Sequence, residues 1–194
     1  MLRVLNDVLN ELPHLLAERS RWQSMDITYF PPHVERLWTA WGDYRVRLHR
    51  VYPPDKPVPI RVGDVPTDIL WHPHKEPSAI YIVAGECLHH AGSENAVLVT
   101  HALGAGMSYE MVHPEAYHAV EALRGPYDSV MVTGKPYANP RAAAVIPGPK
   151  QPPLEKSRED AFYEVWRRRF SLSEPGPYDK RGLKGSAMCR FYYD

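Results

Sequence analysis

Three histidines carry the clearest chemical signal in the sequence. His72 and His74 stand one residue apart in WHPHKEPSAIYIVAGE, and His118 follows in HPEAYHAVEAL. Alternate residues of a β-strand point to the same face, so an extended chain would aim His72 and His74 at one point. A third imidazole from a distant strand would complete a facial site of the kind that holds non-haem iron, manganese or zinc. The spacing therefore predicts that His72, His74 and His118 bind one metal ion.

Neutral imidazoles bind borderline divalent metals, and we expect Fe(II) here, with Mn, Ni and Zn as alternatives. Three neutral ligands leave the ion its full double charge and two or three open positions. Such a centre can polarise a chelating substrate or lower the pKa of bound water. The alternative is a metal-free pocket whose histidines line the wall or act as a general base, because ten histidines in 194 residues make a chance H-x-H pattern plausible.

Other histidines compete for these roles. His89 and His90 stand in what should be the next strand, where at most one of them can face the pocket, and a solvent-facing turn is the favoured interpretation. His113 lies five residues before His118. His118 is preferred as the ligand because it stands at the start of a predicted strand and is followed by the pattern x-Val-Glu.

Further side chains are candidates for catalytic roles around the open positions. Tyr117, together with Tyr81 and Trp71, could form a hydrophobic wall, and Ser78 could supply a hydroxyl. Arg47 could hold a substrate carboxylate through a bidentate pair.

The role of Arg47 depends on which face of its strand lines the domain. In YRVRLHRVY, Arg47 shares one face with Arg45 and His49, and the residues between them are Val46 and Leu48. These two apolar residues need burial, so the interpretation that Arg47 faces solvent is slightly favoured over one in which it lines the site.

The segments that must position these residues indicate a mainly β domain between less regular ends. Residues 1–16 carry a helical stripe of leucine and valine, in which Pro13 should bend or restart the helix. PPHVERLWTAWG, at 31–42, is interpreted as a second short helix. From about 43 to 134 the pattern changes to period two, with seven or more short strands, which is typical of a sandwich or barrel.

The C-terminal part of the chain has a different composition. Residues 135–156 hold six prolines and predict an extended strap or linker. A helix is expected near 157–171, with Ser157 as its N-cap. The predicted domain organisation is therefore 1–42 as a helical segment, 43–134 as the β-barrel and 135–194 as a proline-rich extension.

Composition excludes several classes of partner. Lysine plus arginine balance aspartate plus glutamate, 23 against 23, so no net charge favours nucleic acid or an acidic membrane. No apolar run approaches the roughly 20 residues that span a bilayer, and no signal-peptide pattern is present. Two cysteines make no disulfide framework, so we expect a cytoplasmic protein. The partner that we expect is a small-molecule substrate. Exposed sheet edges make a homodimer reasonable.

The histidine pattern resembles the cupin superfamily, whose first motif reads G-x5-H-x-H-x3,4-E-x6-G. This chain gives His72-x-His74, three residues, Ser78, six residues and Gly85, so a serine stands at the usual glutamate position and the opening glycine is missing. The second motif, G-x5-P-x-G-x2-H-x3-N, is similar to GMSYEMVHPEAYHAVEA, one residue short between its proline and His118. The resemblance covers roughly residues 44 to 134 and implies a single double-stranded β-helix (jelly-roll) barrel.

Among cupins, the thiol dioxygenases also lack the glutamate and bind iron through three histidines. YHAVEALRGPYDSVMVTGKPY is similar to their third-ligand segment, although Met131 and Thr133 stand where those enzymes place a histidine and a tyrosine, and only Ser129 is retained. The sequence thus favours a three-histidine, metal-dependent cupin enzyme that oxidises a small polar metabolite with dioxygen. The alternatives are a non-catalytic small-molecule-binding module and a metal-dependent lyase or isomerase.

Overall fold

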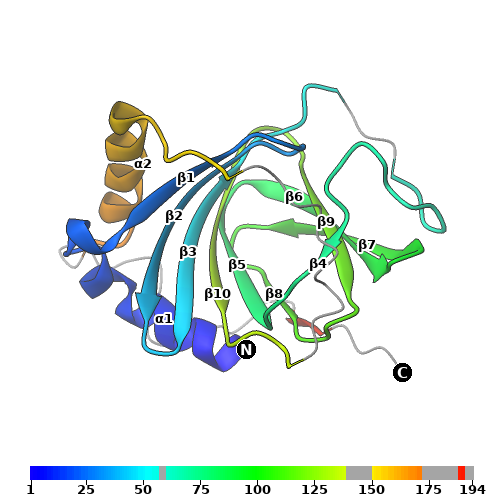
Figure 1. The fold of residues 1–194 in the computed structure, drawn as a ribbon, viewed down its shortest axis with the longest axis horizontal. Coiled ribbons are helices and arrows are strands. Elements are labelled where there is room, and N and C mark those ends of the chain that lie inside the picture. The colour runs from blue at the N-terminus through cyan, green and yellow to red at the C-terminus, as the bar shows by residue number, and fades with distance from the viewer. Residues whose placement is uncertain (57–59, 139–149, 172–187, 191–194) are drawn as a thin grey trace.

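The computed structural model of the chain describes residues 1–56, 60–138, 150–171 and 188–190. These residues form two α-helices, one short 3₁₀ helix and eleven strands, which lie in two facing sheets (Figure 1). In chain order they are α1 (Leu2–Leu15), η1 (Arg19–Arg21), β1 (Gln23–Ile27), β2 (Val34–Trp41), β3 (Tyr44–Val51), β4 (His72–Pro73), β5 (Ser78–Ala84), β6 (Glu86–Ser93), β7 (Ala96–Gly104), β8 (Ser108–Met111), β9 (Tyr117–Ala122), β10 (Tyr127–Thr133), α2 (Lys156–Arg169) and β11 (Met188–Arg190).

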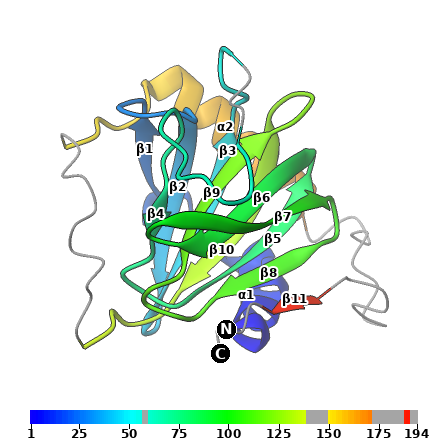
Figure 2. The same ribbon diagram turned by 90° about the vertical axis from the view of Figure 1, so that its right-hand side faces the viewer.

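The strand order is that of a jelly roll. One sheet runs β1-β2-β3-β10-β5-β8-β11 and the other β4-β9-β6-β7. When β3 to β10 are counted as strands one to eight, the sheets contain the orders 1-8-3-6 and 2-7-4-5, which place two Greek keys face to face. Figure 2 shows the four-stranded sheet in front of the larger one. The predicted mainly β, jelly-roll fold is confirmed.

Side-chain alternation divides the large sheet into an outer and an inner layer. On β3 and β5, Val46, Leu48 and Tyr81 pack in an outer cluster with α1. Ile80 and Ile82 point the other way and join a second cluster that includes residues of the smaller sheet. Both layers are buried, so the sheet is covered by helices outside and faces the second sheet inside.

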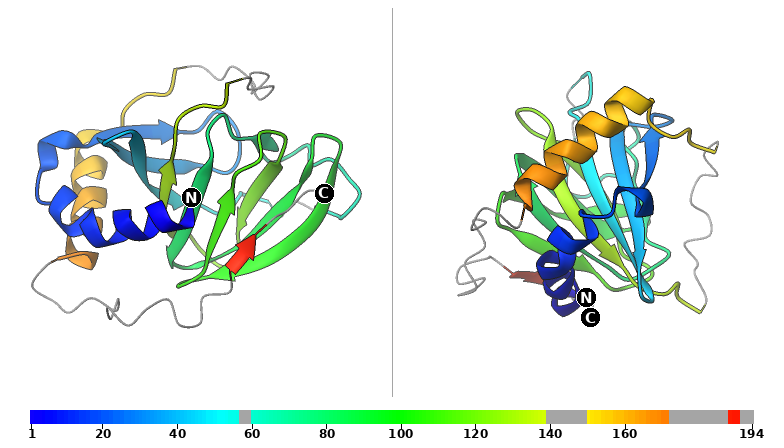
Figure 3. Two further views of the ribbon diagram at one scale, coloured as in Figure 1. Left: turned by 90° about the horizontal axis from the view of Figure 1, so that it is seen from below. Right: turned by 90° about the vertical axis from the view of Figure 1, so that its left-hand side faces the viewer.

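Helix α1 packs along the outer layer through the predicted leucine and valine stripe (Figure 3). Leu12 and Val8 are fully buried, and burying one such side chain contributes about 1.5–3 kcal/mol. Pro13 lies inside this helix without restarting it. Its position in the last turn costs only one backbone hydrogen bond, which explains the tolerance.

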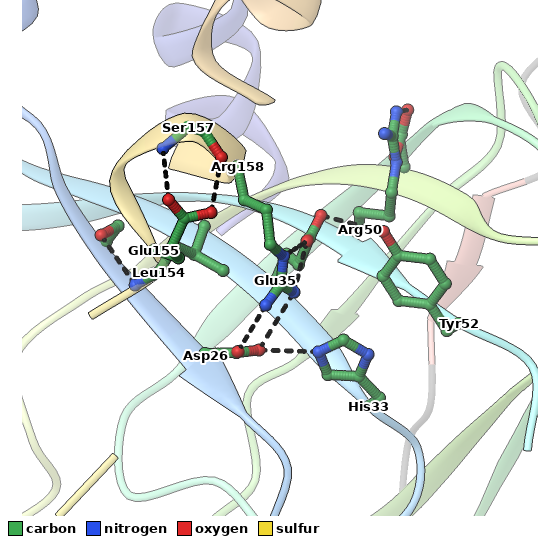
Figure 4. Close-up of polar contacts among 11 residues, drawn as sticks. Asp26, His33, Glu35, Arg50, Tyr52, Leu154, Glu155, Ser157 and Arg158 are labelled. Carbon is green, nitrogen blue, oxygen red and sulfur yellow. Dashed lines mark hydrogen bonds and ion pairs between the residues drawn. The ribbon is translucent and has the colours of Figure 1, made fainter. Parts of the chain in front are cut away.

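Helix α2 closes the other end of the outer layer, where Arg158 reaches across β1 and β2 (Figure 4). The helix was predicted near 157–171, and its existence is confirmed. Its N-cap, however, is Glu155, whose side chain accepts a hydrogen bond from the Ser157 backbone N–H. The predicted cap at Ser157 is therefore wrong, and Ser157 lies inside the first turn.

The predicted second N-terminal helix is also wrong, because residues 34–41 form strand β2. Apolar residues at 34, 37, 38 and 41 fit a helical stripe. In the structure β2 lies between β1 and β3 and pairs antiparallel with both. Backbone pairing with two neighbours, with Leu37 facing the helices, outweighs the local pattern.

Part of the predicted proline-rich strap, 139–149, and most of the tail lie outside the described residues. Within the described part, β11 pairs in parallel with β8 at the edge of the large sheet.

None of the described helices has the length and apolar character needed to cross a membrane. The division into 1–42, 43–134 and 135–194 stays a prediction.

Candidate metal centre

The three predicted histidines meet between the two sheets. His72 of β4 pairs directly with His118 of β9, and His74 follows β4 by one residue. The ring centroids of His72 and His118 are 4.7 Å apart, those of His74 and His118 4.5 Å, and those of His72 and His74 5.4 Å. One nitrogen from each ring lies within 4.8 Å of the others. The structure thus brings together the side chains that the spacing selects, while their role as ligands remains a prediction.

Each of the three rings has its Nδ1 atom engaged by another group. His72 Nδ1 lies 3.1 Å from the Leu70 carbonyl oxygen, which can only accept, so this nitrogen is the donor. His74 Nδ1 lies 2.5 Å from Ser78 Oγ, and His118 Nδ1 lies 3.2 Å from His89 Nε2. When Nδ1 donates in each ring, all three Nε2 atoms present lone pairs. This tautomer is the one that a metal site with Nε2 ligands requires.

The facing nitrogens fit a cation. His118 Nε2 lies 2.8 Å from His74 Nε2, and two lone pairs at that distance repel unless a proton or a metal ion lies against them. Imidazole nitrogens sit about 2.0–2.1 Å from a divalent ion, which places neighbouring ligands roughly 3 Å apart at a right angle. The observed contact has that spacing, so the nitrogens of His74 and His118 fit two ligands of one ion, with His72 as the third ring of the cluster.

The surroundings keep these rings neutral. Burial lowers the pKa of His72, although the Leu70 carbonyl raises it. Burial, followed by neighbouring histidines, holds the pKa values of His74 and His118 well below their ordinary value. A neutral imidazole is the form that binds metal, so no proton has to be released at neutral pH before an ion can bind.

His89 is the functional neighbour that the sequence interpretation missed. It lies in β6, is fully buried, and faces His118 and the ring of Tyr109, whose centroid is 4.1 Å away. Burial lowers the pKa of His89 to about 3, so it stays neutral and can accept from His118. The favoured interpretation of His89 as part of a solvent-facing turn is wrong. The alternation of β6 could have identified it, since only one of His89 and His90 can face inward.

His90 faces the other side of β6. Its Nδ1 lies 2.9 Å from Thr100 Oγ1, and its Nε2 lies 3.9 Å from Glu121. His113 is exposed in the turn before β9 and accepts a hydrogen bond from the Glu115 backbone N–H. Neither ring joins the cluster, so His113 does not compete with His118.

Ser78 and the predicted aromatic wall occupy different places from those expected. The Ser78 hydroxyl lies behind His74, against Nδ1, rather than beside the open side of the cluster. Tyr117 is on the face of β9 opposite to His118, and its ring lies 6.1 Å from that of Trp71. Tyr81 packs in the outer cluster with α1. Ser78 therefore positions a ligand, whereas the two tyrosines do not reach the cluster.

Arg47 and His49 on the polar face of β3 line the interior, so the expectation that Arg47 faces solvent is wrong, whereas Arg45 near the start of the strand is exposed. His49 is buried, and Arg47 pairs with Glu76 at 3.5 Å and contacts Met131 Sδ at 3.8 Å. Val46 and Leu48 are buried too, on the helix side, which leaves the polar residues of β3 to face the second sheet. Beside them, Arg36 of β2 donates from Nε to His49 Nε2 at 2.8 Å.

Two surface hollows lie away from the histidines. A groove of about 590 Å³ runs between α1 and α2 and includes Leu16, Tyr163 and Phe170 in its lining. A smaller hollow of about 360 Å³ is formed by residues 60–68. His72 and His74 are themselves partly exposed and His118 is buried, so the cluster is reached from the β4 side.

The comparisons with known proteins found matches among solved structures. No protein-family model matches the chain, and no curated protein matches it. Hydroxypropylphosphonic acid epoxidase from S. wedmorenis is 14% identical with a TM-score of 0.44, covering 60% of this chain and 56% of that protein. A single-residue variant of oxalate decarboxylase from B. subtilis is 12% identical with a TM-score of 0.41, covering 60% of this chain and 28% of that protein. A structure from work on DMSP lyases is 18% identical with a TM-score of 0.39, covering 53% of this chain and 47% of that one. The chain spans less than two thirds of each of these proteins.

Proposed function

We propose that the protein is a mononuclear, metal-dependent enzyme of the cupin type, with His72, His74 and His118 as ligands and Fe(II) as the first-choice metal. One observation carries the proposal. Three neutral imidazoles from two separate segments place one nitrogen each within 4.8 Å of the others, and each ring is held from behind through Nδ1. Rings held in this way are preorganised for an ion and lose little conformational freedom when it binds.

The reaction class that we propose is oxygen-dependent oxidation of a small polar metabolite that chelates the metal. A bound ion would supply Lewis-acid and redox chemistry at positions that the three imidazoles leave open. The chain's own residues hold the ligands and shape the interior. Ser78 fixes His74, His89 fixes His118, and the carbonyl of Leu70 fixes His72.

A second candidate is a lyase or isomerase in which the ion acts only as a Lewis acid. One observation favours it. Met131, which stands where the thiol dioxygenases place a histidine, is inward and contacts Arg47 through its sulfur. A thioether cannot relay a proton, so the oxidative analogy lacks that part of its machinery.

Metal content tests the proposal. The full chain, produced without an affinity tag and purified without chelators, is analysed by inductively coupled plasma mass spectrometry beside His74→Ala and His113→Ala. We expect close to one equivalent of metal in the natural chain and in the His113→Ala control, and a loss of most of it in His74→Ala. Equal metal in all three, or none in any, would overturn the site.

Oxygen uptake separates the two reaction classes. The Fe(II)-reconstituted protein is mixed with a panel of hydroxy, oxo and amino acids in an oxygen electrode, and product formation is followed in parallel by mass spectrometry. Substrate-dependent oxygen consumption that is absent in His74→Ala supports oxidation. Turnover without oxygen consumption would instead support the lyase or isomerase.

A further inference from the structure

Arg36 is an inward-facing cation without a carboxylate partner among the described residues. It lies on β2 and pairs across to His49 of β3. Alternation places it on the same face as Val34, which packs against the inner cluster. Its one hydrogen bond within the described part of the chain runs from Nε to His49 Nε2, at 2.8 Å.

The arrangement orients the guanidinium group. Arginine carries five N–H donors in a planar fork that matches a carboxylate through two parallel hydrogen bonds. The contact with His49 uses Nε, and among the described residues the Nη donors have no hydrogen-bond partner. His49 accepts because burial, followed by Arg36 and Arg47, holds its pKa well below the ordinary value and keeps it neutral. His49 is thus a positioning residue for Arg36.

The interior around Arg36 has an excess of positive charge. Arg47 pairs with Glu76 at 3.5 Å, so that cation is partly compensated. Burial lowers the pKa of Arg36 to about 9, and repulsion from Arg47 and Arg45 adds to the shift, while Tyr29 and Glu76 partly offset it. An unpaired cation in such surroundings is unfavourable, and a bound anion would relieve the cost.

Arg36 also lies close to the histidines. His49, which accepts from Arg36, shares a face of β3 with Arg47, and Arg47 pairs at 3.5 Å with Glu76, two residues after His74. An anion held by Arg36 would therefore sit beside the three imidazoles, within the same interior.

We infer that Arg36, oriented by His49 and flanked by Arg47, forms a carboxylate subsite beside the three-histidine cluster, and that the substrate is a small carboxylic acid. This inference rests on the proposed function for its place next to a metal, but the subsite itself needs only the protein. The assignment moves the anion-binding role from Arg47, which Glu76 and Met131 already contact, to Arg36.

The test measures binding of acetate, with acetamide as the neutral isostere, to the full chain in a low-salt buffer free of other carboxylates. Calorimetry or ligand-observed NMR is run on the protein as purified and again after metal removal. The variants are Arg36→Gln, Arg36→Lys and the control Arg124→Gln, whose side chain is 88% exposed. Thermal unfolding checks that each variant is folded.

We expect acetate to bind the natural chain and Arg124→Gln, and acetamide to bind at least tenfold more weakly. Arg36→Gln should weaken acetate binding at least tenfold, and Arg36→Lys should fall between them because it keeps the charge but loses the fork. Acetate binding that is unchanged in Arg36→Gln, or equal binding of acetamide, would overturn the subsite.

Failure of this inference differs from failure of the proposed function. If the chain holds no metal but binds acetate through Arg36, the metal proposal fails and the subsite stands. If the chain holds one metal and acetate binding ignores Arg36, the metal proposal stands and the subsite fails.

Discussion

Arginine and histidine meet on both sides of the large sheet, but their partners differ. On the outer side, Arg158 of α2 bridges Asp26 at 2.8 Å and Glu35 at 2.7 Å, and His33 contacts Asp26 at 2.7 Å (Figure 4). On the inner side, Arg36 contacts only the neutral ring of His49 within the described residues. Among the described residues, the outer arginine is paired with two carboxylates, whereas the inner one leaves positive charge and lone pairs that a ligand could use.

The difference teaches how to separate structural from functional polar groups in this fold. An outer arginine satisfied by two carboxylates holds a helix on a sheet. Inner groups that are neutral, buried and held from behind have no such structural task, and their arrangement costs stability unless something binds. Substitutions in the outer region should therefore lower the stability of the fold, whereas substitutions in the inner region should change ligand binding more than stability.

Removing the outer cation should cost the most stability. Arg158→Met leaves Glu35, which is 5% exposed, with only the Tyr52 hydroxyl among its described hydrogen-bond partners. We expect a loss of about 2–3 kcal/mol in the free energy of unfolding, because a buried carboxylate loses its cation. Urea denaturation at pH 7 measures this, with Arg167→Met, an exposed residue of the same helix, as control. A loss no larger than that of the control would break the comparison.

Removing the hydroxyl behind His74 should act on the metal rather than on the fold. Ser78→Ala deletes the group that holds His74 Nδ1. Metal affinity should fall about 10- to 100-fold, which corresponds to roughly 1.4–2.7 kcal/mol. Competition with a chromophoric chelator measures the affinity. An unchanged affinity would mean that the ring needs no support from Ser78.

Removing the inner cation should leave the fold intact. Arg36→Met replaces a partly buried guanidinium that has no carboxylate partner among the described residues with an apolar chain of similar length. The free energy of unfolding should stay within about 1 kcal/mol of the natural value, or rise, because the cost of burying the charge disappears. Urea denaturation beside Arg158→Met gives the direct contrast. A loss as large as that of Arg158→Met would show that Arg36 is structural.

Acid should remove the stability that Asp26 contributes to the outer network. Burial raises the pKa of Asp26, but hydrogen bonds from His33 and Arg158 outweigh it, so the pKa lies below its ordinary value of 3.8. A carboxylate with a lowered pKa contributes stability above its unfolded value and loses it as pH falls through the folded one. The stability difference between the natural chain and Asp26→Asn should therefore be smaller below about pH 4 than at pH 5–7. Urea denaturation across this range tests the trend, and a difference that grows in acid would contradict it.

The sequence predicted the centre of the site better than its surroundings. The H-x-H spacing and the strand that begins near His118 carry their own geometry, because alternation fixes which side chains share a face. Ser78 was located by its place in the motif, but whether it lies beside or behind His74 depends on how the chain turns between β4 and β5. His89 could not be chosen over His90 from the sequence, because alternation allows only one of the two to face inward and does not say which. The position of β6 in the structure decides for His89.

Failures in the fold have a related cause. The middle of β3 is covered on both faces, so the apolar side at Val46 and Leu48 could not reveal that Arg47 and His49 face the second sheet. In β2 the apolar residues fit a helical stripe, and only pairing with β1 and β3 decides for a strand. Long-range pairing is what a local pattern cannot supply.

X-ray absorption spectroscopy of the protein purified without a tag or chelator tests the central claim most directly. The predicted spectrum has one metal per chain, with imidazole scattering from three nitrogen ligands at about 2.0–2.1 Å, and imidazole scattering that decreases in His118→Ala. A protein without metal, or a metal whose spectrum lacks imidazole and is indifferent to His118, would contradict the account.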